Sequence, residues 1–257
     1  MTDNTISATQ LYREKREPVL LKGRIKEWAA IEKWTWEYLK ELAQDRTVKL
    51  VAGNREIGKT RFVHMQLAEY IDIVANPDMQ QKTEKLYLKE FDLLTEFPEL
   101  NQDTHYATFF PKNMTVGNNA WIGVQGATTG LHYDVFHNLF TQVRGNKKFL
   151  LLPNEKVERS DYSDKFDSYA RLSTLDLFDA NTAVKLEPIV VDVEPGDSLF
   201  IPKGWWHQVK SVDPCISVSG FMVNTWEYWT TGTWEAGLKF VHDKGLYKKG
   251  NCTCHAQ

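Results

Sequence analysis

The spacing of apolar residues near position 70 predicts an amphipathic helix. Leu67, Tyr70, Ile71 and Val74 recur at positions i, i+3, i+4 and i+7, and residues with this spacing lie on one face of an α-helix. The pattern therefore indicates a helix that packs this face against a core.

The residues before that helix predict two strands and a second helix. Residues 18–22 and 48–51 are short apolar runs of strand length. Thr35 can cap a helix over residues 36–43, because its hydroxyl can accept a hydrogen bond from the first helical turn. Residues 1–17 are polar, and we expect this N-terminal segment to be ordered only in part.

From residue 85 onward the pattern changes to short β runs divided by Gly, Pro and Asn. Arg144-Gly145-Asn146 separates two of these runs and predicts a tight hairpin loop. Residues 154–185 form a polar insertion, either a lid or substrate loop or simply a solvated connection. The expected strands are residues 85–89, 120–124, 131–136, 139–143, 147–152, 189–193, 198–201, 206–212 and 216–223. At least eight strands are typical of a small barrel or jelly roll.

Beyond Asn224 the chain turns helical and carries an unusual number of bulky apolar residues. Trp226, Trp229, Trp234 and Phe240 lie within this stretch. We expect this C-terminal extension, residues 225–257, to pack against the core as part of the same domain or to form a homodimer interface.

Composition excludes several classes of protein. A net charge of −3 provides no broad basic field, so nucleic-acid binding is disfavoured. No apolar run approaches the roughly 18 residues that span a bilayer. The first residues lack a secretory pattern, and three cysteines are too few for a disulfide framework. We expect a soluble, cytoplasmic protein, or a nuclear one if the source is eukaryotic, with no membrane partner.

The triplet His132-Tyr133-Asp134 carries the main candidate chemistry. In a strand, residues two apart point to the same face, so His132 and Asp134 can grip one metal ion. With His207, which ends the run Gly204-Trp205-Trp206-His207, they would form the two-histidine, one-carboxylate triad typical of non-haem Fe(II). The triplet alone is a weak signal, because so short a motif arises readily by chance.

Strand periodicity also sorts the neighbours of the triplet. Phe136 and Asn138 lie an even number of positions from His132, so an unbroken strand would turn them toward the same pocket. His137 would face away as a packed or exposed residue that does not bind the metal. A bulge between residues 134 and 138 would reverse this assignment.

The wider sequence around these residues resembles the JmjC family of Fe(II)- and 2-oxoglutarate-dependent oxygenases. The similarity comprises the stretches 128–134, 138–140, 143–148 and 194–207, with Glu194-Pro195-Gly196-Asp197 opening the last of them. Within the family, the segments 18–23 and 91–100 are similar to those of small protein hydroxylases, such as the asparaginyl hydroxylase of hypoxia-inducible factor. The resemblance spans residues 18–224. It implies a single catalytic domain, mainly β, with a double-stranded β-helix (a jelly roll or cupin barrel) and flanking N- and C-terminal helices.

The resemblance also implies roles for individual residues. Fe(II) would be held by His132, Asp134 and His207, and 2-oxoglutarate and O2 would take the remaining positions on the metal. Lys147 is matched to the cation that binds the distal carboxylate of 2-oxoglutarate. From composition alone, Lys147-Lys148 fits a solvated turn better. The hydroxyls of Thr129 and Tyr87 would assist Lys147, although Tyr87 equally fits a core residue, and Asn138 would orient co-substrate or substrate.

The implied activity is hydroxylation of an amino-acid side chain in a protein or peptide, with release of succinate and CO2. Three alternatives remain: a lysine demethylase, an RNA-modifying hydroxylase of the same fold, and a non-catalytic cupin-like binding protein.

The chain departs from the family at two positions near the site. Val135-Phe136-His137 stands where several protein hydroxylases carry two glutamines, so substrate contacts are expected to differ. The last core strand has no asparagine near the cofactor, and Ser219 is a weak substitute.

A second group of metal-binding residue types ends the chain. Cys252-Thr253-Cys254-His255 suggests zinc, but this short cluster cannot supply a tetrahedral site by itself. The sequence therefore disfavours a metal site there.

Overall fold

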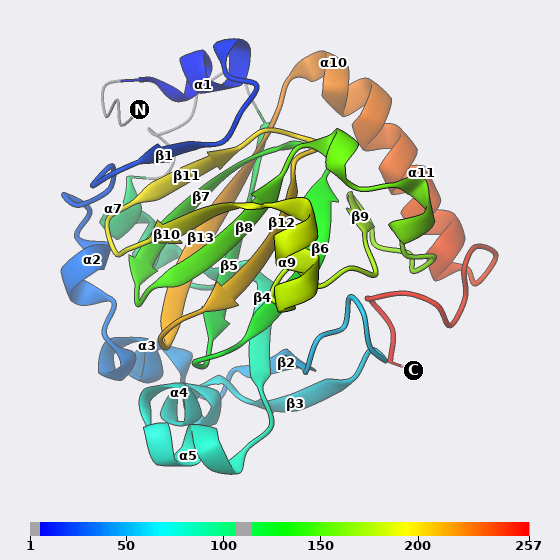
Figure 1. Ribbon diagram of the computed structural model, residues 1–257. Helices are drawn as coiled ribbons and strands as arrows, with labels where there is room; N and C mark the ends of the chain where they lie inside the picture. The colour runs from blue at the N-terminus through cyan, green and yellow to red at the C-terminus, as the bar shows by residue number, and fades with distance from the viewer. Residues whose placement is uncertain (1–5, 106–114, 257) are drawn as a thin grey trace.

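A computed structural model describes residues 6–105 and 115–256, and its centre is a pair of β-sheets (Figure 1). Residues of both sheets line a cavity. Within the described residues, one sheet has eight strands in the order β1-β11-β7-β13-β5-β4-β2-β3, and the other has five in the order β10-β8-β12-β6-β9. The strands are β1 (Val19–Leu21), β2 (Thr47–Ala52), β3 (Phe62–Gln66), β4 (Leu86–Phe91), β5 (Thr115–Gly123), β6 (Thr128–Asp134), β7 (His137–Arg144), β8 (Lys147–Leu152), β9 (Ala170–Leu172), β10 (Ile189–Val193), β11 (Ser198–Ile201), β12 (Trp206–Ser211) and β13 (Cys215–Val223).

The order of the central strands is that of a jelly roll. Strands β11, β7, β13 and β5 are neighbours in the larger sheet, and β10, β8, β12 and β6 are neighbours in the smaller one. All of these neighbours pair antiparallel. From β5 to β8 the chain changes sheet at every strand, as a double-stranded β-helix requires. The predicted fold class is confirmed, and all the strands expected from residue 85 onward are present.

The predicted hairpin at residues 144–146 is wrong. β7 and β8 belong to different sheets, so the turn between them carries the chain across the barrel. Gly145 has φ +66° there, and a Cβ atom on it would lie 2.1 Å from the carbonyl oxygen of Pro214. The sequence of a two-residue turn does not show whether the turn closes a hairpin or connects two sheets, because this depends on which strands pair with β7 and β8.

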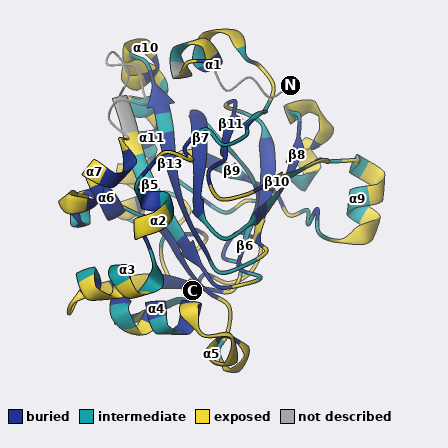
Figure 2. Cartoon of the chain, turned by 90° about the vertical axis from the view of Figure 1, so that its left-hand side faces the viewer, coloured by how far each residue is buried: buried dark blue, intermediate teal, exposed yellow. Residues whose placement is uncertain are grey.

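Two predicted helices outside the barrel are confirmed. α3 (Trp36–Ala43) begins at Thr35, whose hydroxyl accepts a hydrogen bond of 3.1 Å from the backbone N–H of Tyr38. α4 (Leu67–Ala75) buries all four residues of the predicted apolar face. Figure 2 shows the same contrast across the chain, with buried residues concentrated in the strands and exposed ones on outer helix faces.

Several elements escaped the sequence analysis. The N-terminal segment was expected to be only partly ordered, but residues 8–14 form a helix that Ser7 caps and that buries Leu11. Residues 1–5 lie outside the described part. The 154–185 insertion includes the strand β9, which pairs with β6 beside the metal triplet. The remaining helices that precede the C-terminal segment are α1 (Ala8–Glu14), α2 (Ala30–Lys33), α5 (Pro77–Lys82), α6 (Leu93–Glu96), η1 (Pro98–Leu100), α7 (Asn101–Thr104), η2 (Asn154–Lys156), η3 (Arg159–Asp161) and α9 (Ala180–Leu186).

The C-terminal segment is helical, as predicted, and runs along one side of the barrel (Figure 1). It comprises α10 (Thr225–Glu227), the π-helical turn η4 (Tyr228–Gly232) and α11 (Thr233–Asp243). Trp226, Trp229 and Trp234 are 66–77% exposed, so these side chains do not pack against the core. Among the described residues, no helix is both long and apolar enough to cross a membrane.

Candidate metal and co-substrate site

Three predicted metal ligands meet at one end of the cavity. β6 carries His132 and Asp134, and β12 carries His207, which is the direct antiparallel partner of His132. The Nε2 atoms of His132 and His207 lie 3.9 and 3.7 Å from the carboxylate oxygens of Asp134. All three ligand atoms fall within 4.8 Å of one another, which is close enough to share a single metal ion.

Both imidazoles are oriented for metal binding. The Nδ1 atom of His132 lies 2.8 Å from the carbonyl of Gly130, and that of His207 lies 3.0 Å from the carbonyl of Trp205. A proton on Nδ1 would satisfy each carbonyl, leaving Nε2 with a free lone pair toward the site. Burial, together with the neighbouring His207, lowers the pKa of His132 to about 4, and burial does the same for the pKa of His207. The two rings are therefore neutral at neutral pH.

The strand that carries the triplet ends at Asp134. The side chains that follow it still point in the directions expected for an unbroken strand. β6 ends at Asp134 and β7 begins at His137, while Phe136 and Asn138 both line the cavity. Asn138 donates a hydrogen bond of 3.3 Å to the Asp134 carboxylate. His137 points out of the cavity and stacks on Phe200, with ring centroids 5.6 Å apart.

Lys147 lies in the same cavity and is almost completely buried. Its ammonium donates to the hydroxyls of Tyr87 at 2.8 Å and Ser217 at 2.7 Å. Burial lowers the pKa of Lys147. Its neighbour Lys148 points the other way and pairs with Asp192 at 2.9 Å on the surface. Lys147 forms no ion pair with any described residue. A carboxylate that enters the cavity would therefore meet a cation whose charge no anion neutralises.

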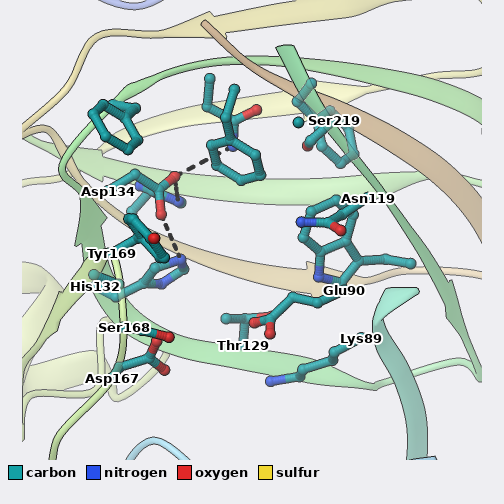
Figure 3. A pocket seen from close by; sticks show the side chains of 18 of the residues that line it. Lys89, Glu90, Asn119, Thr129, His132, Asp134, Asp167, Ser168, Tyr169 and Ser219 are labelled. Carbon is teal, nitrogen blue, oxygen red and sulfur yellow. Dashed lines mark hydrogen bonds and ion pairs between the residues drawn. The ribbon is translucent and has the colours of Figure 1, made fainter. Parts of the chain in front are cut away.

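The other predicted site residues also border this cavity, whose volume is about 450 Å³. Thr129, Tyr87 and Ser219 line it, together with Asn119, which the sequence analysis did not single out. Figure 3 shows Asp134 and His132 on one side and Asn119 and Ser219 on the other. Ser217, which holds Lys147, was not assigned a role, because its inward direction depends on the register of β13.

A network of charges borders the cavity and was missed in the sequence; Arg55, Glu56 and Lys89 are buried in it, and Glu90 is exposed. Lys89 lies 2.8 Å from Glu56, and Arg55 contacts both Glu56 and Glu90. Burial alone would raise the pKa of Glu56, but Lys89 and Arg55 lower it to about 2. The second Glu56 oxygen accepts a hydrogen bond of 3.2 Å from the N–H of Gly130, two residues before His132. This network therefore positions the strand that carries the triplet.

The segment before β9 supplies another wall of the cavity. Asp167, Ser168 and Tyr169 line it, and burial raises the pKa of Asp167 to about 7. Tyr169 and Glu90 are non-glycine residues in left-handed backbone conformations, with φ +66° and +56°. Such strain concentrates at functional sites, where the surrounding structure imposes it.

The sequence profile of the family described as "Cupin-like domain" matches residues 7–227. The chain therefore belongs to this cupin-like family, in its JmjC-type branch of 2-oxoglutarate-dependent oxygenases. The family that the motifs indicated is therefore confirmed.

Two curated relatives have a similar degree of identity to this chain. Jumonji C domain-containing protein 5 of Drosophila melanogaster is 29% identical, over 80% of this chain and 54% of its own length. Lysine-specific demethylase JMJ30 of Arabidopsis thaliana is also 29% identical, over 80% of this chain and 50% of its own length. The chain thus spans about half the length of these relatives.

The fold likewise matches a solved structure. The X-ray structure of E. coli ycfD aligns with a TM-score of 0.56 and 20% identity, covering 94% of this chain and 58% of that chain. At this identity the match shows a shared fold.

The residues present fit the metal and co-substrate that the family uses. Two neutral imidazoles and one carboxylate are the donor set of a facial Fe(II) site. Lys147 offers a buried cation for a carboxylate, and the Oδ1 atom of Asn138 is buried and has no hydrogen-bond partner among the described residues, so it is available to accept one from a bound ligand. The cavity thus provides a group for each end of a 2-oxoglutarate molecule.

Proposed function

We propose that this chain is an Fe(II)- and 2-oxoglutarate-dependent dioxygenase that hydroxylates an amino-acid side chain in a protein or peptide. The observation that carries this proposal is that one cavity holds both the His132-Asp134-His207 triad and the buried Lys147. A non-catalytic binding protein would need neither three converging metal ligands nor a buried cation without an anion.

In this proposal each residue has a defined task. His132, Asp134 and His207 hold Fe(II), which when bound supplies the redox chemistry for O2 activation with 2-oxoglutarate. Lys147, with Tyr87 and Ser217 fixing its ammonium, binds the distal carboxylate of 2-oxoglutarate. Asn138 keeps the Asp134 carboxylate oriented.

The apolar part of the cavity excludes water around these groups. Phe140 and Phe149 both line it and stack edge to face, with ring centroids 4.8 Å apart. A dry cavity strengthens the attraction between Lys147 and a carboxylate, because the local dielectric is low.

A protein substrate is supported by relatives and by the cavity wall. Two relatives carry JmjC or lysine-demethylase names, and the latter refers to a protein side chain. Glu90 and Asp167 also line this wall, where Glu90 is paired with Arg55 and burial raises the pKa of Asp167 to about 7, and Tyr169 adds an aromatic ring. Aromatic rings attract cationic side chains, so we propose a basic segment as the substrate.

Anaerobic titration with Fe(II) and 2-oxoglutarate tests the cofactor assignment. Chelation of iron by 2-oxoglutarate should produce a metal-to-ligand absorption band in the visible range. His132→Ala should abolish the band, whereas His64→Ala, which removes an exposed imidazole on β3, should leave it intact. A wild-type protein that gives no band and releases no succinate in air with candidate peptides would point to the non-catalytic alternative.

Demethylation is the second candidate, favoured by the same aromatic ring and by the demethylase name of one relative. It begins with hydroxylation of an N-methyl group, which then collapses to the amine and formaldehyde. Mass spectrometry of peptides treated with the protein separates the two reactions. Hydroxylation adds the mass of one oxygen atom, while demethylation removes a methylene and releases formaldehyde. The same assay on RNA oligonucleotides tests the RNA-modifying alternative.

We also propose that the chain forms a homodimer through α10 and α11. Trp226, Trp229, Trp234 and Phe240 are more than 60% exposed on this segment. Large apolar side chains gathered on one surface segment are typical of protein–protein interfaces.

A further inference from the structure

The C-terminal tail folds back so that His242 joins the cysteine and histidine cluster at its end. His242 lies near the end of α11, ten residues before Cys252. Ligand atoms of His242, Cys252, Cys254 and His255 all fall within 4.8 Å of one another. The fourth donor that the short Cys-x-Cys-His run lacked is thus provided by the tertiary structure.

The separations match a tetrahedral site. Nε2 of His242 lies 3.1 Å from Nδ1 of His255 and 3.2 Å from Sγ of Cys254. Nδ1 of His255 lies 3.3 Å from the sulfur atoms of both Cys252 and Cys254. With Zn–N bonds of about 2.0–2.1 Å and Zn–S bonds of about 2.3 Å, tetrahedral ligand atoms lie about 3.3–3.8 Å apart. Shifts of a few tenths of an ångström would therefore admit the ion.

The surroundings orient the first ligand. Nδ1 of His242 lies 2.7 Å from the carbonyl oxygen of Tyr247, so a proton there would leave Nε2 free to bind a metal. The Phe166 ring packs on the same imidazole, with centroids 4.4 Å apart, and Tyr247 meets Phe166 edge to face. These rings shield one side of the cluster from water.

The backbone of the cysteine loop is held by segments far away in the sequence. Cys252 forms a parallel bridge with Phe166, and its carbonyl accepts a hydrogen bond of 2.6 Å from Thr60. Thr60 lies in the loop between β2 and β3. Figure 1 shows this loop beside the C-terminal end of the chain. The loop is thus positioned by contacts that do not involve the four ligand side chains.

The cluster is directly connected to the cavity wall. The Thr253 hydroxyl, between the two cysteines, donates a hydrogen bond of 2.6 Å to the carboxylate of Asp167. The Thr253 carbonyl accepts one of 3.5 Å from Arg55. Asp167 and Arg55 both line the cavity, so the tail contacts two residues of the cavity wall through hydrogen bonds.

We propose that His242, Cys252, Cys254 and His255 bind one structural zinc ion, which fastens the C-terminal tail to the end of α11 and to the cavity wall. Two thiolates and two imidazoles form a closed four-ligand set of the kind that selects zinc. The two thiols release their protons to solvent when the metal binds. The iron triad contains no sulfur, so the two sites differ in metal preference.

Metal analysis of protein purified under reducing conditions tests the site. The double variant His132→Ala/Asp134→Ala removes the competing triad and should retain one zinc per chain. Adding Cys252→Ser and Cys254→Ser to this background should reduce zinc to none. Adding Cys215→Ser instead, a buried thiol on β13 outside the cluster, should leave zinc unchanged.

Cobalt substitution provides a second measurement that needs no variant. Tetrahedral Co(II) bound by thiolates gives intense visible bands and a sulfur-to-cobalt charge-transfer band in the near ultraviolet, which the triad cannot produce. Zinc removal should also lower the Tm and expose the bond after Lys249 to trypsin. A protein that binds no zinc, gives a cobalt spectrum without thiolate bands, or forms a Cys252–Cys254 disulfide in place of metal binding would overturn the proposal.

Discussion

Lys147 is a buried side chain that forms no ion pair within the described residues. A buried ammonium held by two hydroxyls costs free energy unless an anion joins it. Lys148, one residue further, faces solvent and pairs with Asp192. The two lysines therefore form a natural pair for comparison.

Replacing Lys147 with methionine should weaken 2-oxoglutarate binding about 100-fold or more, because loss of one partner of a buried ion pair costs about 3–5 kcal/mol. Isothermal titration under anaerobic conditions measures this affinity. Lys148→Met should bind normally. The Tm of the ligand-free Lys147→Met protein should be equal or higher, since a desolvated charge is removed. A Lys147→Met protein that keeps the wild-type affinity but has a lower Tm would assign Lys147 a structural role instead.

The buried His137 side chain should make the free energy of unfolding of the protein depend on pH. Burial lowers its pKa to about 4, below the value of about 6.5 expected in the unfolded chain. The unfolded state therefore binds more protons between these two values, and the stability that neutral His137 contributes is lost as pH falls from about 6.5 toward 4.

Between pH 7 and 5 this loss should amount to about 1–2 kcal/mol from His137. Urea unfolding of the metal-free protein at the two pH values measures it. His137→Gln should reduce the dependence by this amount, because glutamine does not titrate, and should leave the contributions of His132 and His207, whose pKa values burial also lowers to about 4. An unchanged pH dependence in this variant would show that His137 does not supply the effect.

At the scale of elements, β6 depends on close contact with the loop after β2. A Cβ atom on Gly130 would lie 2.6 Å from Cβ of Glu56 and 3.1 Å from the side-chain oxygen of Asn54. The strand can approach this loop, and Glu56 can accept the Gly130 N–H, only because position 130 has no side chain.

Gly130→Ala should destabilise the protein by about 1–3 kcal/mol through overcrowding. It should also weaken Fe(II) binding, since His132 lies two residues further along the displaced strand. Thermal unfolding and Fe(II) titration give the two readouts. Gly237→Ala, on α11, serves as the control and should not destabilise, because no described atom beyond its chain neighbours and its own helix backbone lies within 4 Å of the added Cβ. Equal behaviour of the two variants would contradict the close-contact argument.

Elements with a clear local pattern were predictable, and a short element that depends on distant pairing alone was not. Thr35 and the apolar face of residues 67–74 identified α3 and α4, because caps and helical periodicity act within a few residues. The strand β9 was missed, since its three residues become a strand only by pairing with β6.

At the scale of the whole molecule, the segment formed by α10, η4 and α11 presents a surface with several exposed large apolar side chains. If this surface forms the proposed dimer, wild-type protein should sediment as a dimer at micromolar concentration. Trp229→Glu with Trp234→Glu should yield a folded monomer, because a charge cannot be buried in the interface without a partner. Val184→Glu, which alters an exposed residue on α9, should remain dimeric. A monomeric wild-type protein would contradict the interface.

The amino-acid sequence by itself determined the chemistry available and its local arrangement. His132 and Asp134 share one face because strand side chains alternate with a period of two, whatever the rest of the chain does. Only the tertiary structure decided which distant groups complete each site. His207 reaches His132 through the pairing of β12 with β6, and His242 reaches Cys252 because the tail is held against Phe166 and Thr60. Both contacts depend on strand register and on backbone contacts between segments far apart along the chain. A local sequence pattern carries no information about either.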